Sequence, residues 1–369
     1  MSENTFGKIF SITSFGESHG KVNGIIIDGV PSGIELNEDI IQEDLDKRKP
    51  GQSQLSTSRK EKDKVEIISG IFKGKTTGAP ICLIIENEDK DSSIYEQYKD
   101  ILRPSHADFS ALKRYGGFAD YRGSGRFSGR ITAGFVMAGA VARKILKKMD
   151  IQIFAYTKSI GNIKDNEKYQ FNSIEELINK RENNNIRALN VEKAHQMENL
   201  ILKVKSQQDS IGGIIKCVVL NLPPGIGSPV FETIEGKISK AIFAIPAVKG
   251  IEFGAGFKAT KMKGSEHNDP WIIKDQKVRT SKNDSGGIIG GISNGMPIEF
   301  QVAIKPTPTI GKSQNSVNIQ SFKNIEMKIS GRHDPCIVPR AIVVVEAMTA
   351  IVLVDLLICE GRIPRVFKD

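Results

Sequence analysis

The pattern of apolar and polar positions predicts a mixture of strands and helices. Short apolar runs indicate strands at 7–13, 24–30, 64–72, 80–86, 151–157, 213–222, 251–260 and 298–305. Apolar residues spaced three and four apart predict helices at 37–48, 130–149, 173–182, 191–206, 231–245 and 340–359. In 191–206 the expected apolar stripe is Val191, Ala194, Met197, Ile201 and Val204. Because strands and helices do not alternate regularly, the pattern favours an α+β fold over a doubly wound parallel sheet.

Two of these helices are unusually apolar. The stretch 340–362 resembles a membrane span, but Glu346 and Asp355 interrupt it, and a span needs roughly 20 apolar residues. We therefore expect a helix in the core or at a subunit interface. The run 131–142 is too short to span a membrane, and its small residues predict close packing against a neighbouring helix.

No long Pro- or Ser-rich linker divides the chain, and its most polar loop, 179–190, has predicted helices close on both sides. We therefore expect one domain over 1–369. The four cysteines, Cys82, Cys217, Cys336 and Cys359, contain no CxxC motif and read as free thiols in a reducing cytosol. The first twenty residues show no apolar export segment, so we expect a cytoplasmic protein.

The net charge of +9, from 52 Lys+Arg and 43 Asp+Glu, suits a polyanionic partner. Arginine is concentrated in one window, 103–130, where five arginines stand beside a single lysine. The planar fork of arginine matches carboxylate and phosphate, and the glycines of this window allow backbone N–H groups to approach an anion. A solvated basic loop is the simpler alternative.

A nucleic-acid-binding protein without catalytic activity is the competing function. Aromatic residues interleave with the arginines and could stack on bases; they are Phe109, Tyr115, Phe118, Tyr121 and Phe127. However, no helix-turn-helix, zinc-finger, RRM or KH pattern accompanies them. A small polyanionic substrate therefore fits the window better than a nucleic acid does.

The segment "SGRHDPC", 330–336, raises the question of metal or acid–base chemistry. Pro335 favours an extended Asp334, which would place Arg332 and Asp334 on one face and His333 on the other. That arrangement and the absence of an HExxH or CxxC motif argue against a metal. A cation beside Asp334 would keep it ionised, and an ionised carboxylate on a rigid turn is a candidate general base.

Eight blocks of sequence, in order along nearly the whole chain, resemble the chorismate synthase family. They are "GKIFSITSFGESHG", "DLDKRKPGQS", "RPSHAD", "DYRGSGRFSGRITAG", "AIPAVKGIEFGAGF", "GGIIGGISNG", "KPTPTI" and "GRHDPCIVPRA". The resemblance implies a lyase of the shikimate pathway that makes chorismate from 5-enolpyruvylshikimate 3-phosphate by 1,4-anti elimination of phosphate, with reduced FMN. It also implies a β-α-β sandwich, with helices between antiparallel sheets, that assembles into a homotetramer. Neither a nucleic-acid partner nor a membrane is expected.

The resemblance also implies roles for individual residues. His19 would protonate the departing phosphate, His106 the reduced flavin, and Asp334 would act as a base through the flavin. Substrate anions would be bound by Arg48, Arg59, Arg103 and Arg130, and Arg48 also matches a position assigned to NADP. FMN contacts would come from Arg126, Phe127, Ser128, Ala247, Gly290, Lys305, Pro306, Thr307, Pro308, Thr309 and Arg332. No metal is implied, and the motifs do not decide whether NADPH reduces the flavin on this protein.

The chain departs from the family pattern at three positions. Phe127 and Gly129 replace a small polar residue and alanine of many members, and Gln54 replaces an arginine of several members. The side-chain contribution at 127 and one anion contact are therefore expected to differ here.

Overall fold

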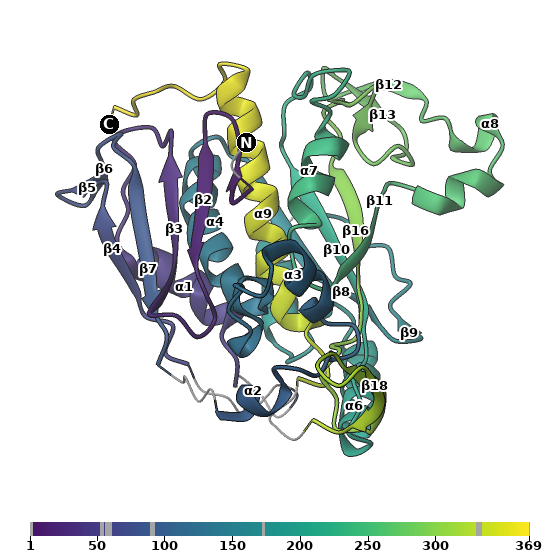
Figure 1. The fold of residues 1–369 in the computed structure, drawn as a ribbon. Helices are drawn as coiled ribbons and strands as arrows, with labels where there is room; N and C mark the ends of the chain where they lie inside the picture. The colour runs from purple at the N-terminus through teal and green to yellow at the C-terminus, as the bar shows by residue number, and fades with distance from the viewer. Residues whose placement is uncertain are drawn as a thin grey trace.

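A computed structural model describes residues 3–51, 55, 61–88, 93–171, 174–329 and 334–368. Two five-stranded antiparallel sheets form the outer layers, and helices fill the space between them (Figure 1). The β-α-β sandwich implied by the sequence motifs is confirmed.

The first sheet has the strand order β1-β2-β3-β7-β4. Its strands are β1 (Thr5–Phe6), β2 (Ser11–Gly16), β3 (Val22–Asp28), β4 (Val65–Ser69) and β7 (Ile81–Glu86), with the small hairpin β5 (Ile71–Phe72) and β6 (Lys75–Thr76) beside β4. In β7, Ile81, Leu83 and Ile85 alternate with more exposed residues and are fully buried. This alternation gives the sheet one apolar face, which lies against the helices.

The second sheet has the order β11-β16-β10-β8-β9. Its strands are β8 (Gln152–Ile160), β9 (Ile163–Lys164), β10 (Gly213–Leu220), β11 (Val248–Phe253) and β16 (Ile298–Ile304). Three further hairpins pair β12 (Trp271–Lys274) with β13 (Lys277–Thr280), β14 (Ile288–Ile289) with β15 (Ile292–Ser293), and β17 (Gln314–Asn318) with β18 (Lys323–Met327).

The helices of the inner layer are α1 (Glu38–Arg48), α4 (Thr132–Lys148), α7 (Ile234–Ile242) and α9 (Val338–Cys359). Elsewhere lie α2 (Ser93–Tyr98), α3 (Asp108–Tyr115), α5 (Ile174–Glu182), α6 (Val191–Ser206), α8 (Gly264–His267) and the 3-10 helices η1 (Arg122–Phe127), η2 (Gly129–Ile131) and η3 (Gly256–Lys261). At the crossing of α4 and α9, a Cβ on Gly139 would lie 2.2 Å from the Cβ of Ala347. The glycine therefore permits the close packing predicted for 131–142.

Helix α9 is buried almost along its whole length. It is long and apolar enough to cross a membrane, yet 89% of its most apolar window is buried inside the protein. Asp355 accepts hydrogen bonds from the backbone N–H groups of Lys8, Ile9 and Phe10. Glu346 pairs with Arg181 at 2.6 Å. The two acidic residues that interrupt the apolar sequence of α9 are thus buried and have partners.

Most predicted elements are confirmed within a few residues, including α6 at 191–206. One is wrong in part: the strand expected over 251–260 ends at Phe253, and η3 follows it. The stripe of α6 is also narrower than predicted. Ala194, Met197 and Ile201 are buried, whereas Val191, in the first turn, is 61% exposed. All four cysteines are free thiols, as predicted.

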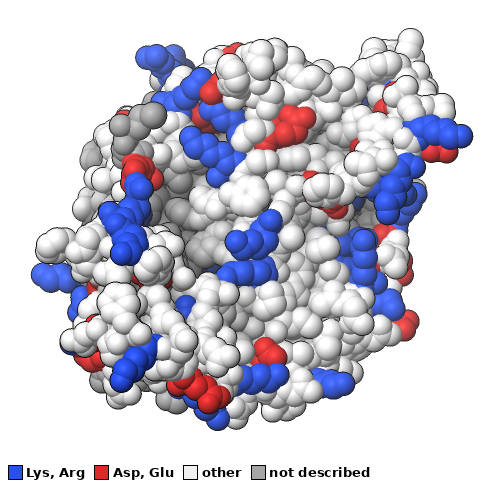
Figure 2. Space-filling view, turned by 45° about the vertical axis from the view of Figure 1, so that its right-hand side comes forward, with Lys and Arg blue, Asp and Glu red and all other residues white. Residues whose placement is uncertain are grey.

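The positive charge is distributed over the surface in separate groups. On the face shown in Figure 2, lysine and arginine side chains form several small groups, and acidic side chains lie beside some of them. The net charge of +9 is therefore not gathered into one basic stripe on this face.

Candidate functional site

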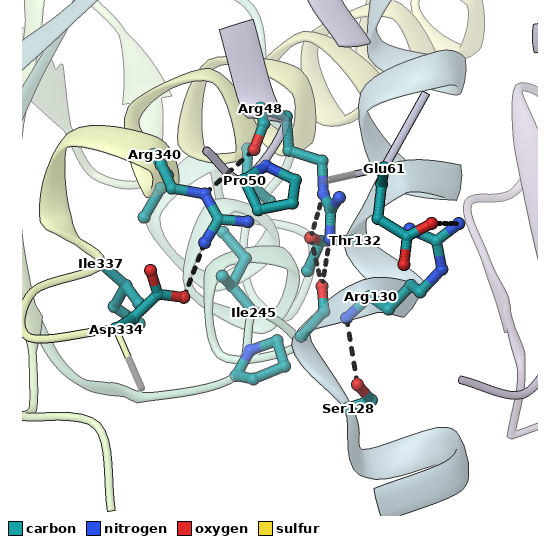
Figure 3. Close-up of a pocket in the computed structure, with 14 residues that line it drawn as sticks. Arg48, Pro50, Glu61, Ser128, Arg130, Thr132, Ile245, Asp334, Ile337 and Arg340 are labelled. Carbon is teal, nitrogen blue, oxygen red and sulfur yellow. Dashed lines mark hydrogen bonds and ion pairs between the residues drawn. The ribbon is translucent and has the colours of Figure 1, made fainter. Parts of the chain in front are cut away.

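A cleft of about 240 Å³ opens where the end of α1, the start of α4 and the start of α9 meet (Figure 3). Polar side chains lie on both sides of the cleft, with apolar residues among them. The lining consists of Arg48, Pro50, Glu61, Ser128, Gly129, Arg130, Thr132, Ile245, Pro246, Asp334, Ile337, Arg340, Ala341 and Val344. Four of the predicted site residues are thus brought together: Arg48, Ser128, Arg130 and Asp334.

Two of the predicted anion ligands are held by one carboxylate. Asp63 accepts from Arg48 Nη1 at 3.0 Å and from Arg130 Nη1 at 2.7 Å, and its side chain is fully buried. Burial alone would raise the pKa of Asp63, but the two guanidinium groups hold it below its usual value. Burial lowers the pKa of Arg48 to about 10 despite Asp63, so both charges persist at neutral pH. Sequence analysis missed Asp63, which no motif singled out.

The loop before α4 supplies the floor of the cleft. Ser128 caps η2, with its Oγ accepting from the N–H of Arg130, and the Gly129 carbonyl accepts from Arg48 Nη2 at 2.9 Å. A Cβ at Gly129 would meet no atom within 4 Å. Glycine in place of the alanine of many family members therefore leaves this space empty. Phe127 is 43% exposed and does not line the cleft.

Asp334 lies at the opposite wall, on the approach to α9. Its Oδ2 accepts from Arg340 Nη1 at 2.7 Å, and its backbone carbonyl accepts from the Thr307 hydroxyl at 2.6 Å. Arg340 Nε in turn donates to the carbonyl of Arg48 at 3.1 Å. Sequence analysis missed Arg340, although the "VPRA" that ends the last motif contains it. Arg332 and His333, predicted to flank Asp334, lie outside the described residues.

His19 lies buried beside this floor rather than in the cleft lining. The turn at Gly123 approaches it so closely that a Cβ there would lie 2.6 Å from His19 Nε2. Gly123 has φ 56°, so a side chain at this position would be strained as well as crowded. The neighbouring Ser18 hydroxyl lies 3.2 Å from that of Ser128, which links the His19 turn to the cleft.

His106 is held in one tautomer. Its Nδ1 lies 3.1 Å from the carbonyl of Pro104, which can only accept, so Nδ1 carries the proton. Nε2 then accepts from the Thr309 hydroxyl at 2.8 Å. Burial, with Arg103 adding to it, lowers the pKa of His106 to about 4. The imidazole is therefore neutral at pH 7 in the protein without ligand.

The arginine window does not form a single anion-binding surface. The fork of Arg103 is occupied by Asp108, at 2.9 Å from Nε and 2.7 Å from Nη2. Arg126 is bound to β2 through Ser14 and the carbonyl of Gly16. Burial raises the pKa of Asp108, but the Arg103 hydrogen bonds outweigh it and lower that pKa.

The remaining arginines of the window are Arg114 and Arg122, which are exposed and paired with acidic residues. Of the five, Arg130 alone lines the cleft. Arg59, a further predicted anion ligand, and Gln54 lie outside the described residues.

The predicted FMN contacts fall into two groups. The run 305–309 adjoins two of the three catalytic candidates, because Thr307 donates to the Asp334 carbonyl and Thr309 to His106. Lys305 Nζ donates to the carbonyl of Ser105, and Lys305 N–H donates to that of Ala247, which follows the cleft residue Pro246. Gly290, in the β14–β15 hairpin, is not part of the cleft lining.

The arrangement suits an anionic ligand with a flat, partly apolar body. Arg48, Arg130 and Arg340 supply cations, Ile245 and Val344 supply an apolar wall, and Asp334 can accept a proton. Among the residues that the structure describes, no group of three or more His, Cys, Asp or Glu could hold a metal ion.

Comparison with known proteins gives a consistent result. The family model described as chorismate synthase matches residues 10–358. A protein named chorismate synthase from Dehalococcoides mccartyi is 52% identical over 99% of this chain and 100% of its own length. Another of that name, from Korarchaeum cryptofilum, is 51% identical over 96% of this chain and 97% of its own length. A crystal structure of chorismate synthase superposes with a TM-score of 0.77 at 33% identity, covering 96% of this chain and 93% of that one.

Proposed function

The chain belongs to the chorismate synthase family, and from this premise we propose that it converts 5-enolpyruvylshikimate 3-phosphate to chorismate in the cleft described above. The reaction breaks one C–O bond to phosphate and one ring C–H bond and forms a C=C bond. It is a lyase reaction without net oxidation or reduction.

One observation carries the placement of this chemistry: a carboxylate and three arginines from separate segments line a single cleft. Asp334 comes from the approach to α9, Arg340 from the first turn of α9, Arg48 from α1 and Arg130 from η2. A substrate with two carboxylates and a phosphate needs several cations at one place. A base within reach of a ring proton completes the requirement for elimination.

We assign the substrate anions to Arg48 and Arg130, with Arg103 and Arg59 as further ligands implied by the motifs. In the structure the guanidinium groups of Arg48, Arg103 and Arg130 already bind protein oxygens. Substrate binding by these residues therefore requires either their remaining N–H groups or displacement of a carboxylate. Preformed carboxylate contacts also fix the guanidinium groups in place before substrate arrives.

Reduced FMN fits beside this cleft. The predicted contacts Ser128, Ala247 and the run 305–309 lie on or next to its lining, and Lys305 offers a cation for the phosphate. Apolar residues such as Ile245 and Ile337 would pack against a flavin ring. When bound, reduced FMN supplies an electron-rich ring next to the substrate. Arg126, Phe127, Gly290 and Arg332 are proposed contacts on the strength of the motifs alone.

The two histidines are proposed as proton donors at different positions. His19, buried beside Ser18 and the floor of the cleft, would protonate the departing phosphate. His106, held by Thr309 next to the flavin-binding run, would act toward the flavin. Its low pKa means that it takes up a proton only when a negative charge is bound close to it.

The test uses the purified full chain under anaerobic conditions with dithionite-reduced FMN and 5-enolpyruvylshikimate 3-phosphate. We expect phosphate and chorismate in equal amounts, and neither product with FMN left oxidised. A protein that releases no phosphate yet binds RNA in a salt-sensitive manner would contradict the proposal. Replacing dithionite by NADPH tests whether the protein reduces its own flavin.

We further propose a cytoplasmic homotetramer. The four free thiols support a reducing compartment. Exposed apolar side chains on the segment that projects around α8 and β12–β13 support assembly (Figure 1), among them Phe257 at 79% and Ile273 at 83% exposure. Light scattering coupled to size exclusion should give four times the mass of the 40.5 kDa chain, and a monomer would contradict the assignment.

A further inference from the structure

Arg340 joins two parts of the cleft that come from distant segments. Its Nη1 donates to Asp334 Oδ2 at 2.7 Å, and its Nε donates to the backbone carbonyl of Arg48 at 3.1 Å. Figure 3 shows its guanidinium between these two acceptors, at the edge of the cleft. One planar group therefore fixes the separation between the proposed base and the end of α1.

The exposure of the Asp334–Arg340 pair indicates a role in the cleft rather than in the core. The side chains of Asp334 and Arg340 are 19% and 20% exposed, whereas those of the core pair Arg181 and Glu346 are 6% and 3% exposed. Both members of the pair also line the cleft. A partly hydrated pair at a cleft wall contributes little to stability but orients the carboxylate.

Arg340 is placed to set the direction of the Asp334 carboxylate. The other charged groups that line the cleft are Arg48 from α1, Glu61 from the segment before β4, and Arg130 from η2. Within the part of the chain that the structure describes, Arg340 is the cleft cation whose side chain bonds Asp334. A general base must be held within hydrogen-bond reach of the proton that it removes.

Resting on the proposed function, we propose that Arg340 is a positioning residue that aims the Asp334 carboxylate into the cleft. It does so by bracing Asp334 against the carbonyl of Arg48, so that the base and the substrate-binding arginine keep a fixed relation. Arg340 acts through Asp334 and is not itself the proton acceptor.

The test compares Arg340→Gln and Arg340→Lys with a matched control, Arg187→Gln. Arg187 Nη1 donates to the carbonyl of Pro339, so the control removes an arginine that contacts the start of α9 without touching Asp334. In Arg340→Gln we expect kcat with pre-reduced FMN to fall about 10- to 100-fold with KM changed less than about threefold. Arg340→Lys should recover part of the lost kcat, because an ammonium group can still bond one oxygen of the carboxylate.

A second readout does not depend on flavin. In the apo protein labelled with 13C at aspartate carboxyls, the Asp334 signal is assigned by its loss in Asp334→Asn. At pH 7 the chemical shift of this signal should change in Arg340→Gln, where the carboxylate loses its hydrogen-bond donor, and stay in place in Arg187→Gln. Adding Arg340→Gln to Asp334→Asn should slow turnover little further, because the lost function is the same.

The inference is overturned if Arg340→Gln leaves both kcat and the Asp334 chemical shift unchanged, or if Arg187→Gln changes them equally. These outcomes are distinct from failure of the proposed function, in which the wild-type chain itself forms no chorismate. An equal loss of thermal stability in Arg340→Gln and Arg187→Gln, with kcat and the Asp334 signal unchanged, would assign both arginines to supporting the start of α9 and would also contradict the proposal.

Discussion

At the scale of single residues, the site depends on carboxylates that hold arginines. Asp63 adopts a left-handed backbone conformation, φ 45°, in which its two oxygens reach Arg48 and Arg130. Aspartate tolerates this conformation better than most residues. The fully buried side chain and its two charged partners indicate that this contact supports the fold as well as the cleft.

Replacing Asp63 tests that role. Asp63→Asn would remove the carboxylate that the two buried guanidinium groups share and leave Arg130 with Glu61 at 3.5 Å. We expect a loss of about 3–5 kcal/mol in the free energy of unfolding. Glu43→Gln is the matched control, since Glu43 pairs with Lys47 on the exposed side of α1; its expected loss is below about 0.5 kcal/mol. Urea unfolding measures both, and equal midpoints for Asp63→Asn and wild type would contradict the prediction.

The low pKa of His106 makes the stability of the apo protein depend on pH in a direction that can be worked out. The pKa of His106 is about 4 in the folded protein, whereas its ordinary value is 6.5. The unfolded chain therefore binds more protons between these values, and stability falls as pH drops from about 6.5 toward about 4. The contribution at stake is on the order of 3 kcal/mol. In His106→Asn the slope of unfolding free energy against pH should flatten in that window, and an unchanged slope would refute the assignment.

At the scale of elements, the close crossing of α4 and α9 determines how the helices of the inner layer pack. Gly139 and Ala347 meet where any larger residue would push the helices apart. The buried pair of Arg181 and Glu346 then ties α9 to α5, beside the second sheet. The start of α9 carries Arg340, so the position of this helix also sets the wall of the cleft.

Gly139→Ala is expected to destabilise the protein by at least about 1–3 kcal/mol, because its Cβ would lie 2.2 Å from that of Ala347. Gly236→Ala, on the exposed side of α7, should change stability by less than about 1 kcal/mol, since alanine also has the better helix propensity. Thermal unfolding of both variants gives the comparison. If Gly139→Ala were as stable as wild type, the helices would have to separate at little cost.

The elements that sequence patterns predict well are those with a strong apolar signal. The long apolar run of α9 and the alternation of buried and exposed residues in β7 are strong signals for a helix and a strand. The β12–β13 hairpin was missed because its strands are largely exposed. Within the site, motifs identified Arg48 and Asp334 singly. They could not reveal Asp63 or Arg340 as partners, because those contacts depend on how distant segments meet.

At the scale of the whole molecule, one hydrophobic core extends through both sheets and the helices between them. It includes Ile25 of β3, Val141 of α4, Ile351 of α9 and Val302 of β16. A smaller cluster, with Phe154 and Leu177, packs α5 on the outer side of the second sheet. This continuity supports the proposal that residues 1–369 act as a single domain.

A single domain predicts a single unfolding transition. In calorimetry of the apo protein, one peak should appear, and it should coincide with loss of the far-ultraviolet and near-ultraviolet circular dichroism signals. Two separated transitions, or signals that change at different temperatures, would indicate that the two sheets unfold independently and would contradict the proposal.

The central position of α9 has a consequence for synthesis on the ribosome. Asp355 meets the N–H of Lys8 across 347 residues of sequence, and a ribosome adding about 5–20 residues per second needs roughly 20–70 s to make that much chain. Throughout this interval the second sheet lacks α9, which packs against β8 and β10, and α4 lacks its main partner helix. The nascent chain therefore carries exposed apolar strands until its last segment emerges. Any interruption of translation before α9 leaves a product that cannot close its core and is a substrate for chaperones and proteases.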